Sequence, residues 1–436
     1  MKILFINGNP YKPAVPPIGL EYVCEAAQNA GHETVIYDFS HESPAGLERS
    51  VRAYRPDVIG ITLRNIDTGH LFNNISYIPE LKALIAGIRV YFSGPVVLGG
   101  AGFSLLPSGI MREVEADYGI IGEGEESFPR LLENLGDPAR VPNLVIRDKE
   151  TGKIVCTPRE MGRPLRLKLK RGTINHPKYY ELFSRHPTHS LANIQTKRGC
   201  NKNCTYCAEP DVIGRTIIKR EPEEIIDEIR RFIGKGIVDK FFFVDSEFNV
   251  CPDHAAAVCE ALLKHDLRIG WTCYLTPENT GKDLISLMKR AGCTSMVWSM
   301  ESASETVLKG LGKAYAPSDV MRIAGICGEM DQPYIILLMF GGPGESVATV
   351  NETWRNVRKA KKAFFGIITG VRIYPSTPLA RQALKDGVIS REEDLLFPVF
   401  HRKEYTRDVI FPAVEKRFGS MKDCVLLGPE KKTKFD

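Results

Sequence analysis

The sequence predicts an α/β protein built from two parallel-sheet domains, a doubly wound Rossmann-like sheet followed by a partial (β/α)6 barrel. Three observations predict this class. Short apolar runs alternate with helical patterns along most of the chain, as they do in βαβ units. Polar, glycine-rich segments such as NGNPYKP, LGGAG and GEGEE follow the apolar runs, where parallel sheets bind ligands. At 436 residues the chain is also too long for one ordinary core.

The first domain is expected over residues 1–145. Its elements are strands at 2–8, 33–39, 57–63 and 90–100, an amphipathic helix at 19–31 that ends at a glycine, and a strand, loop and helix within 117–135. Residues 146–190 are less regular and are predicted to connect the domains. Their basic stretch RPLRLKLKRG is interpreted as a solvated connector or packing arm rather than a nucleic-acid patch.

The second domain is expected over residues 191–385 as a partial barrel, with its chemistry at the carboxyl ends of the strands. Six strands are predicted at 190–199, 240–248, 269–275, 294–302, 334–345 and 366–375, with helices at 221–236, 253–266, 281–292, 317–330 and 347–362. Residues 386–436 are predicted to form a short, charged tail with a frayed end.

Composition excludes several classes of protein. The net charge of +5 is a small excess and gives no reason to expect a nucleic-acid partner. No apolar run approaches the roughly 18 residues of a membrane helix, and the first ten residues lack the pattern of a signal peptide. A cytoplasmic location is therefore predicted. That compartment keeps thiols reduced, so the eleven cysteines are not expected to form a disulfide framework.

Three of these cysteines stand apart from the others. Cys200, Cys204 and Cys207 fall within eight positions, in the segment KRGCNKNCTYC. Thiolates ligate soft metals. Zinc is one interpretation, but a closed zinc site needs four ligands, and the nearest histidines lie upstream at unsuitable spacing. Three thiolates around an iron–sulfur cubane would leave one iron open to bind a substrate.

At these positions the sequence resembles the radical S-adenosylmethionine (SAM) superfamily, whose signature is CxxxCxΦC with Φ aromatic. Tyr206 stands at the aromatic position, so the match is complete. The resemblance implies a 4Fe–4S cluster on the three thiolates, with SAM chelating the fourth iron. It also implies reductive cleavage of SAM to a 5′-deoxyadenosyl radical, with Tyr206 near the adenine.

Further stretches resemble the SAM contacts of that family. VDSEF occupies the position of its GGE motif, of which only Glu247 keeps the chemistry, and a carboxylate there can accept hydrogen bonds from the SAM ammonium. WSMESASETVLKGLGK and MFGGPGES resemble the motifs of its fourth and fifth strands. The resemblance implies SAM contacts by Ser299, Glu301, Ser302, Gly342 and Glu345.

The first domain resembles the cobalamin-binding domain that precedes many radical SAM domains, through LGGAG and DYGIIGEGEESFPRLLENL. A dinucleotide-binding domain is the alternative, but no GxGxxG follows the first strand. A ligand-free α/β domain is another. The cobalamin contacts implied are Asn9, Thr62, Arg64, Asn65, Gly99, Gly100, Gly122, Glu123 and Gly124. The family's DxHxxG is absent, so cobalamin is expected base-off without a histidine ligand from the protein.

These resemblances imply a cobalamin-dependent radical SAM enzyme, and favour a methyltransferase that acts on an unactivated carbon or phosphorus of a small molecule or peptide. A rearrangement, ring contraction or cyclisation with the same cofactors is a second interpretation, and a non-catalytic cobalamin or Fe–S binding protein is a third. A flavodoxin or ferredoxin is expected as electron donor, with neither a nucleic-acid partner nor an integral membrane segment. The sequence assigns no catalytic side chain and no substrate.

Overall fold

The structure is a computed structural model that describes residues 1–8, 15–148, 150–161, 171–174, 178–179, 192–236 and 240–429. The chain divides into two compact units. The first contains Met1–Thr68, Ile75–Arg185 and Asp211–Ile218, and the second contains Gly69–Asn74, His186–Pro210 and Lys219–Asp436. The predicted α/β class and order of domains are confirmed. None of the described helices is long and apolar enough to cross a membrane.

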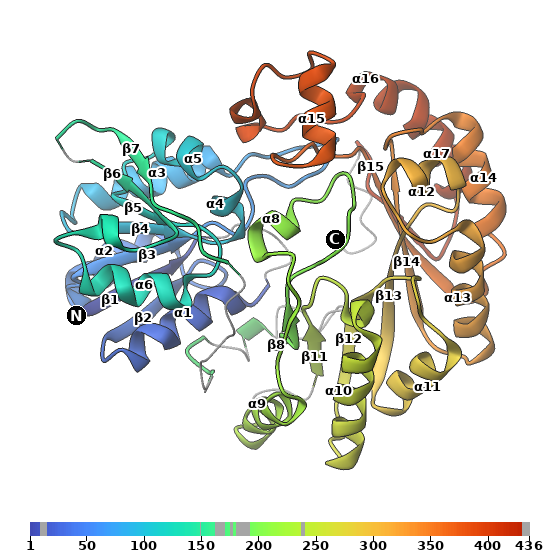
Figure 1. Ribbon diagram of the computed structural model, residues 1–436, viewed down its shortest axis with the longest axis horizontal. Helices are drawn as coiled ribbons and strands as arrows, with labels where there is room; N and C mark the ends of the chain where they lie inside the picture. Colours follow the sequence, from blue (N-terminus) through green and yellow to red (C-terminus); the bar gives the residue numbers. More distant parts are fainter. Residues whose placement is uncertain are drawn as a thin grey trace. The chain divides into compact units, whose positions relative to one another are not determined.

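The first unit contains a seven-stranded sheet in the order β2-β1-β3-β4-β5-β6-β7 (Figure 1). Its strands are β1 (Lys2–Asn7), β2 (Glu33–Asp38), β3 (Val58–Thr62), β4 (Val96–Gly99), β5 (Tyr118–Ile120), β6 (Leu144–Arg147) and β7 (Ile154–Cys156). Its helices are α1 (Ile18–Asn29), α2 (Leu47–Tyr54), α3 (Ile78–Arg89), α4 (Ala101–Leu105), α5 (Pro107–Glu113) and α6 (Gly124–Glu133). The first five strands are parallel, and β6 and β7 are antiparallel additions.

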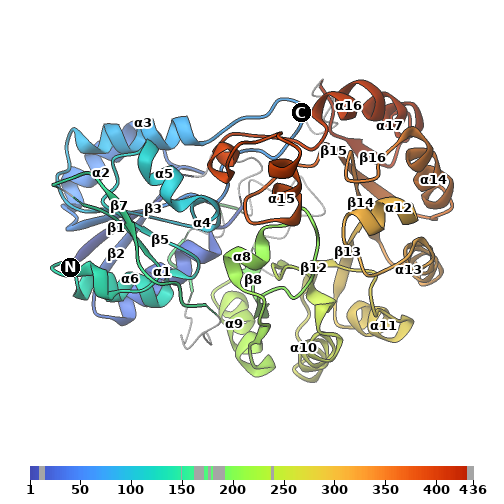
Figure 2. The ribbon, with the colours of Figure 1, turned by 45° about the horizontal axis from the view of Figure 1, so that its top comes forward.

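Helices cover both faces of this sheet, as a doubly wound fold requires. α1 and α6 lie on one face, and α3 and α5 lie on the other (Figure 2). The core under α1 and α6 joins apolar side chains of both helices, such as Leu20 and Phe128, to strand residues such as Phe5. The strand expected over 90–100 begins only at Val96, because α3 extends to Arg89 and Val90 is exposed.

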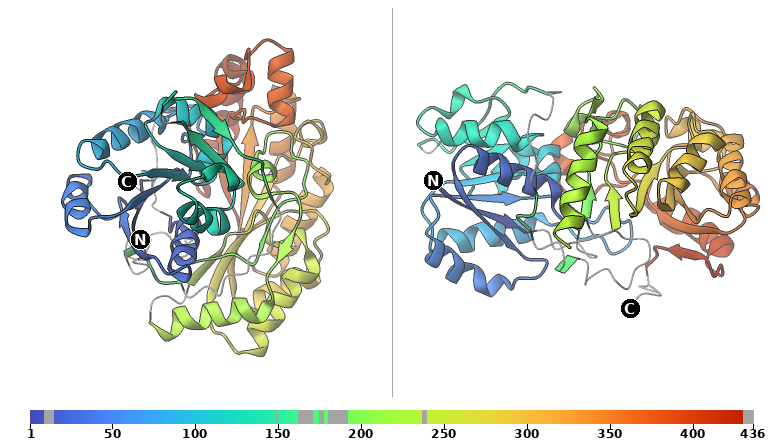
Figure 3. Two further views of the ribbon diagram at one scale, coloured as in Figure 1. Left: turned by 60° about the vertical axis from the view of Figure 1, so that its left-hand side comes forward. Right: turned by 90° about the horizontal axis from the view of Figure 1, so that it is seen from below.

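The second unit contains a parallel sheet of seven strands in the order β16-β15-β14-β13-β12-β11-β8. The strands are β8 (Ala192–Ile194), β11 (Lys240–Phe243), β12 (Gly270–Leu275), β13 (Cys293–Glu301), β14 (Tyr334–Phe340), β15 (Ala363–Thr369) and β16 (Cys424–Leu426), and a separate ribbon pairs β9 (Lys197–Arg198) with β10 (Ile218–Lys219). The sheet curves into a partial barrel with helices around its outside (Figure 3). These helices include α9 (Pro222–Gly234), α10 (Pro252–Lys264), α11 (Lys282–Arg290), α13 (Pro317–Glu329) and α14 (Val347–Val357).

The C-terminal region is more structured than a charged tail. It contributes α16 (Lys403–Tyr405), α17 (Phe411–Phe418) and the strand β16, which pairs in parallel with β15. The ring of Phe418 packs against Phe340, Trp354 and Phe365, with centroids 5.0 to 6.3 Å apart. Its aromatic side chain therefore anchors α17 against β14, α14 and β15. The barrel gains a seventh strand beyond the six that were predicted.

Candidate active site

The cysteine loop follows the first barrel strand, as expected, and two other segments hold it in place. The Thr205 amide donates to the carbonyl of Leu311 at 3.0 Å, and its hydroxyl donates to the carbonyl of Gly310 at 2.9 Å. Gly310 ends α12 (Glu305–Gly310), and Leu311 follows it. On the other side, the Leu379 amide at the start of α15 (Pro378–Lys385) donates to the Thr205 carbonyl at 2.9 Å. The backbone of the loop is therefore fixed between two helix ends.

The three thiols of this loop are the candidate cluster ligands. Cys200 is buried, and Cys204 and Cys207 are half-buried. Burial raises the pKa of Cys200 to about 11 and that of Cys207 to about 12, so metal binding must displace protons. In the part of the chain that the structure describes, no three His, Cys, Asp or Glu side chains converge on a single-ion site. A cubane would place a separate iron before each thiolate and so does not need the three thiolates to meet on one ion.

A buried lysine lies beside the second cysteine. The side chain of Lys313 is 6% exposed, and its Nζ is 3.4 Å from Glu301 Oε1 and 5.4 Å from the centre of the Tyr206 ring. The Tyr206 hydroxyl donates to the same Glu301 oxygen at 2.8 Å. Burial alone would lower the pKa of Lys313, but several neighbouring groups, of which Glu301 has the largest effect, together outweigh burial and raise the pKa. Lys313 therefore presents a positive charge next to Cys204, whose pKa it lowers against the larger effect of burial.

Glu301 reaches this position through a distortion of its strand. The register between β13 and β14 shifts between Ser299 and Glu301, and Glu301 adopts a φ of +56°. Left-handed backbone is uncommon for a side chain other than glycine, and bulges re-aim side chains at sites. The Tyr315 hydroxyl donates to the carbonyls of Ser299 and Met300 at 3.0 and 3.1 Å. Tyr315 thus supports the irregular end of β13.

Glu247 brings a second carboxylate to the same region. It follows β11, and burial raises its pKa to about 7, with Lys313 and Lys202 opposing that shift and Glu301 adding to it. The charges of Lys313 and Glu301 thus both act on Glu247. The predicted residues Tyr206, Glu247 and Glu301 are therefore brought together near the cysteine loop, around a lysine that the sequence analysis did not single out.

Three other predicted SAM contacts, Ser299, Ser302 and Gly342, have different surroundings from the group around Lys313. Ser302 is buried, and its hydroxyl is 2.9 Å from that of Thr353 on α14, so it supports helix packing rather than joining this group. Ser299 is half-buried on β13. Gly342 lies in the turn after β14, where a Cβ would stand 2.9 Å from the side chain of Leu311. A Cβ there would have to displace the buried Leu311 side chain.

Glu345 closes that turn. Its carboxylate accepts from the Gly341 amide at 3.3 Å and from the Thr349 hydroxyl at 2.5 Å, and the side chain is buried. Burial raises the pKa of Glu345 to about 7. Its contacts stabilise the turn, and the structure shows none between it and the group around Lys313.

We expect Glu345→Gln to flatten the pH dependence of unfolding. Because the pKa rises from 4.5 to about 7 on folding, the folded state favours the protonated form. That stability is present below pH 4.5 and is lost as the pH rises through 7, by about 3 kcal/mol. Glutamine keeps an acceptor without the charge. Melting temperatures from pH 5 to 8 should fall less in the variant than in the wild type, and equal slopes would contradict this assignment.

The first unit carries a glycine-lined edge at the carboxyl ends of β3, β4 and β5. Gly100 has a φ of +104°, and a Cβ there would stand 2.6 Å from the carbonyl oxygen of Leu63. Nothing lies within 4 Å of a Cβ at Gly99, so its backbone is open to close approach. The Ser104 hydroxyl donates to the Gly100 carbonyl at 2.9 Å and accepts from the Gly122 amide at 2.8 Å. This hydroxyl joins the ends of β4 and β5.

The other predicted cobalamin contacts surround this edge. Thr62 ends β3, Arg64 is exposed, and Asn65 is half-buried one residue further. Glu123 is half-buried after β5, and Gly124 begins α6, where a Cβ would stand 2.8 Å from Val23. Asn9 lies outside the described residues. Half-exposed small and polar groups at three strand ends fit a large, flat ligand better than a closed core would.

The ends of β1 and β2 are closed by the connector. Asp38 Oδ1 accepts from the Asn7 side-chain amide at 2.9 Å, and Asp38 Oδ2 accepts from the Tyr179 hydroxyl at 2.5 Å. Arg171 donates through Nε to Glu21 on α1 at 2.8 Å, and both side chains are fully buried. The described part of the connector is therefore a packing arm at Arg171 and Tyr179. It leaves the ends of β3, β4 and β5 as the candidate ligand edge.

Gly100→Ala should weaken cobalamin binding about tenfold or more, because a side chain at this φ displaces the loop after β4. We would load the protein with hydroxocobalamin, remove the excess by gel filtration and count cobalt and iron per chain. Gly87→Ala, within α3 where a Cβ meets nothing within 4 Å, is the matched control. Full cobalt binding by the Gly100 variant would contradict the assignment of this edge.

Several residues of these sites gave no usable signal in the sequence. Lys313 stands in the stretch GLGK, where a single lysine is typical of a solvated surface. Gly312, with a φ of +70°, lets the backbone pass so close to the cysteine loop that a Cβ would stand 2.5 Å from the Asn203 carbonyl oxygen. The pair of glycines flanking Leu311 was the one available indication of a close approach.

Both halves of the chain match the models of known families. Residues 194–357 match the radical SAM superfamily, and residues 6–132 match the B12 binding domain. Tryptophan 2-C-methyltransferase of Streptomyces laurentii is 24% identical, over 88% of this chain and 75% of its own. The anaerobic magnesium-protoporphyrin IX monomethyl ester cyclase of Rubrivivax gelatinosus is 22% identical, over 82% of this chain and 66% of its own.

A solved structure shows the same fold. The radical S-adenosylmethionine methyltransferase TsrM from Kitasatospora setae, with cobalamin and a [4Fe-4S] cluster bound, superposes with a TM-score of 0.81. It is 24% identical, and the match covers 88% of this chain and 78% of that one. Both predicted domain types, and their order along the chain, are thereby confirmed.

Proposed function

We propose that this chain, a radical SAM enzyme with a B12-binding domain ahead of its barrel, is a methyltransferase. It transfers a methyl group from SAM, by way of cobalamin, to an unactivated carbon or phosphorus of a small molecule or peptide. The observation that carries the proposal is the group around Lys313. A three-thiol loop, a buried ammonium and two carboxylates meet within one unit. A binding protein for storage has no need of an ammonium and two carboxylates beside a cysteine loop.

Each charged group in the barrel has a matching part of SAM. Cys200, Cys204 and Cys207 would hold the cluster through their thiolates. Glu247 would accept hydrogen bonds from the amino group of SAM, and Lys313 would bind its carboxylate. Tyr206 is fixed by Glu301 and can lie against the adenine. When bound, the cluster supplies the electron that cleaves SAM, and cobalamin supplies a cobalt that carries methyl.

The cobalamin would bind at the edge formed by Thr62, Gly99 and Gly100. The loop after β1 contains no histidine, so we propose base-off binding without a histidine from this chain. An external protein of the flavodoxin or ferredoxin type would deliver the electron. The protein itself binds and orients the cofactors and the substrate, and it excludes water from the reacting groups.

A cyclisation or rearrangement with the same cofactors is the second candidate function, favoured by the similarity to the cyclase of Rubrivivax gelatinosus. Both reactions use the same charged groups in the barrel. They differ in whether the methyl group of SAM reaches cobalt.

Labelled SAM distinguishes the two functions. We would incubate the reduced holoenzyme with SAM carrying a ¹³C-methyl group and measure the label on extracted cobalamin by mass spectrometry. A methyltransferase is expected to label the cobalamin in proportion to the cobalt bound. Deoxyadenosine formed without labelled cobalamin would favour cyclisation or rearrangement and would contradict methyl transfer.

A further inference from the structure

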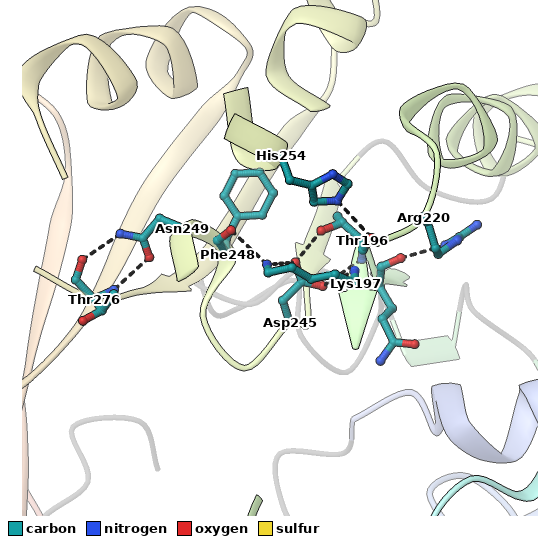
Figure 4. A network of polar contacts seen from close by, with 9 residues as sticks. Thr196, Lys197, Arg220, Asp245, Phe248, Asn249, His254 and Thr276 are labelled. Atoms are coloured by element: carbon teal, nitrogen blue, oxygen red, sulfur yellow. Dashed lines mark hydrogen bonds and ion pairs between the residues drawn. The ribbon is translucent and has the colours of Figure 1, made fainter. Parts of the chain in front are cut away.

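One buried carboxylate joins the start of the cysteine loop to the end of the next strand. Asp245 is 2% exposed and lies two residues beyond β11. Its Oδ1 accepts from the backbone amides of Thr196 at 2.7 Å and Lys197 at 3.2 Å. Its Oδ2 accepts from the Thr196 hydroxyl and from Lys197 Nζ, the latter at 2.7 Å. Figure 4 shows these contacts converging on a single side chain.

The carboxylate continues a pairing that the two strands no longer make. Ile194 is the last β8 residue paired with β11, and its carbonyl accepts from the Val244 amide at 2.8 Å. Beyond this point the chain no longer pairs with β11, although Lys197 lies in β9 and pairs with β10. On the β11 side, the amides of Thr196 and Lys197 donate to Asp245 instead. A carboxylate that accepts several such bonds is among the stronger fixed contacts in a protein.

Lys197 secures the carboxylate from the other side. It is 3% exposed, donates to the Phe248 carbonyl at 2.9 Å, and lies 5.5 Å from the centre of the Phe248 ring. The Thr196 carbonyl in turn accepts from the Arg220 amide at 3.0 Å and lies 3.1 Å from His254 Nε2. Removing either charge would leave the other buried without its partner, which is costly.

The position of this pair in the chain gives it a consequence for the site. Lys197 lies three residues before Cys200, and Asp245 lies two residues before Glu247. In the proposed function, which this inference rests on, Cys200 holds the cluster and Glu247 holds the amino group of SAM. One SAM molecule must reach both the cluster and Glu247, although Cys200 and Glu247 follow different strands. A shift between the two strand ends would therefore misplace SAM on the open iron.

We propose that Asp245 is a positioning residue, which through Lys197 and Thr196 sets the cluster loop in register with Glu247. The test is the holoenzyme carrying Asp245→Asn, with Thr196→Val as a milder second variant that removes only the hydroxyl contact. We would normalise to iron content and measure KM for SAM and kcat for deoxyadenosine formation. The change that SAM causes in the electron paramagnetic resonance spectrum of the reduced cluster would also be recorded.

For Asp245→Asn, we expect about a tenfold rise in KM for SAM, or more, because charge-assisted contacts are lost. The spectral change on adding SAM should be weakened or broadened. Thr196→Val should also raise KM for SAM and weaken the spectral change, but by less than Asp245→Asn does. Gln332→Ala is the matched control, because Gln332 is also buried and donates to a backbone carbonyl, that of Cys293 at 3.0 Å, away from the loop. Gln332→Ala should lower the stability of the fold and leave KM for SAM and the spectral change as in the wild type.

Two results separate the possible failures. If the wild type forms deoxyadenosine and both variants keep its KM and its spectral change per cluster, Asp245 only stabilises the fold and the inference is overturned. If the wild type itself forms no deoxyadenosine and binds no SAM at its cluster, the proposed function fails first. Should Asp245→Asn not fold, the Thr196→Val result decides, since unchanged SAM binding in that variant also overturns the inference.

Discussion

Cys204→Ala is expected to abolish deoxyadenosine formation, with a loss of about a thousandfold or more. Cys204 is the thiol next to Lys313, and without it the loop retains two of the three proposed cluster ligands. The cluster should then assemble poorly or fail to hold the open iron for SAM. The measurement is deoxyadenosine released per chain, under dithionite and SAM, together with iron content.

Cys156→Ser is the matched control for this variant. Cys156 is exposed on β7 in the other unit, so its loss should change neither iron content nor rate. Retention of four irons and wild-type deoxyadenosine formation by Cys204→Ala would show that the loop does not hold the cluster.

Lys313→Met is expected to have the second largest effect. Methionine fills the same space but leaves Glu301 half-buried beside Tyr206 without its cation, and breaking such a pair costs about 3–5 kcal/mol. The variant should unfold at a lower temperature. In the folded fraction, affinity for SAM should fall by about a hundredfold, since the cation proposed for its carboxylate is gone. Binding is measured by equilibrium dialysis with labelled SAM under anaerobic conditions.

Lys309→Met, an exposed position on α12, controls for the loss of a lysine in the same segment. Lys309→Met should change neither the unfolding temperature nor the affinity for SAM. Wild-type SAM affinity in folded Lys313→Met would contradict the role of this ammonium.

Helices and strands that follow from a local pattern of apolar residues could be predicted from the sequence. The strand predicted at 334–345 is present as β14 over Tyr334–Phe340, and the remaining residues GGPGE form the turn after it. The cysteine loop was found because its chemistry depends on spacing alone. Glu247 was singled out because VDSEF resembles the family's GGE motif in its position, and its contact with SAM stays a prediction.

What the sequence did not reveal depends on contacts between distant residues. β16 is three residues long and is a strand only because β15 offers it an edge. Lys313 reads as a surface residue until Glu301 is brought beside it by a bulge in β13. The hydrogen bonds of Ser302 and Glu345 with hydroxyl groups on α14 also join distant residues, and the SAM contacts of both stay predictions. Arg171 could not be assigned a buried partner 150 residues away.

The measurement that tests the central claim most directly is deoxyadenosine formation by the reconstituted protein, with metals counted on the same sample. We would reconstitute the chain anaerobically with iron, sulfide and hydroxocobalamin, remove the excess, and add SAM with dithionite. The account predicts about four irons and one cobalt per chain, with deoxyadenosine formed by the wild type and absent for Cys204→Ala. Iron and cobalt bound without any deoxyadenosine would contradict it.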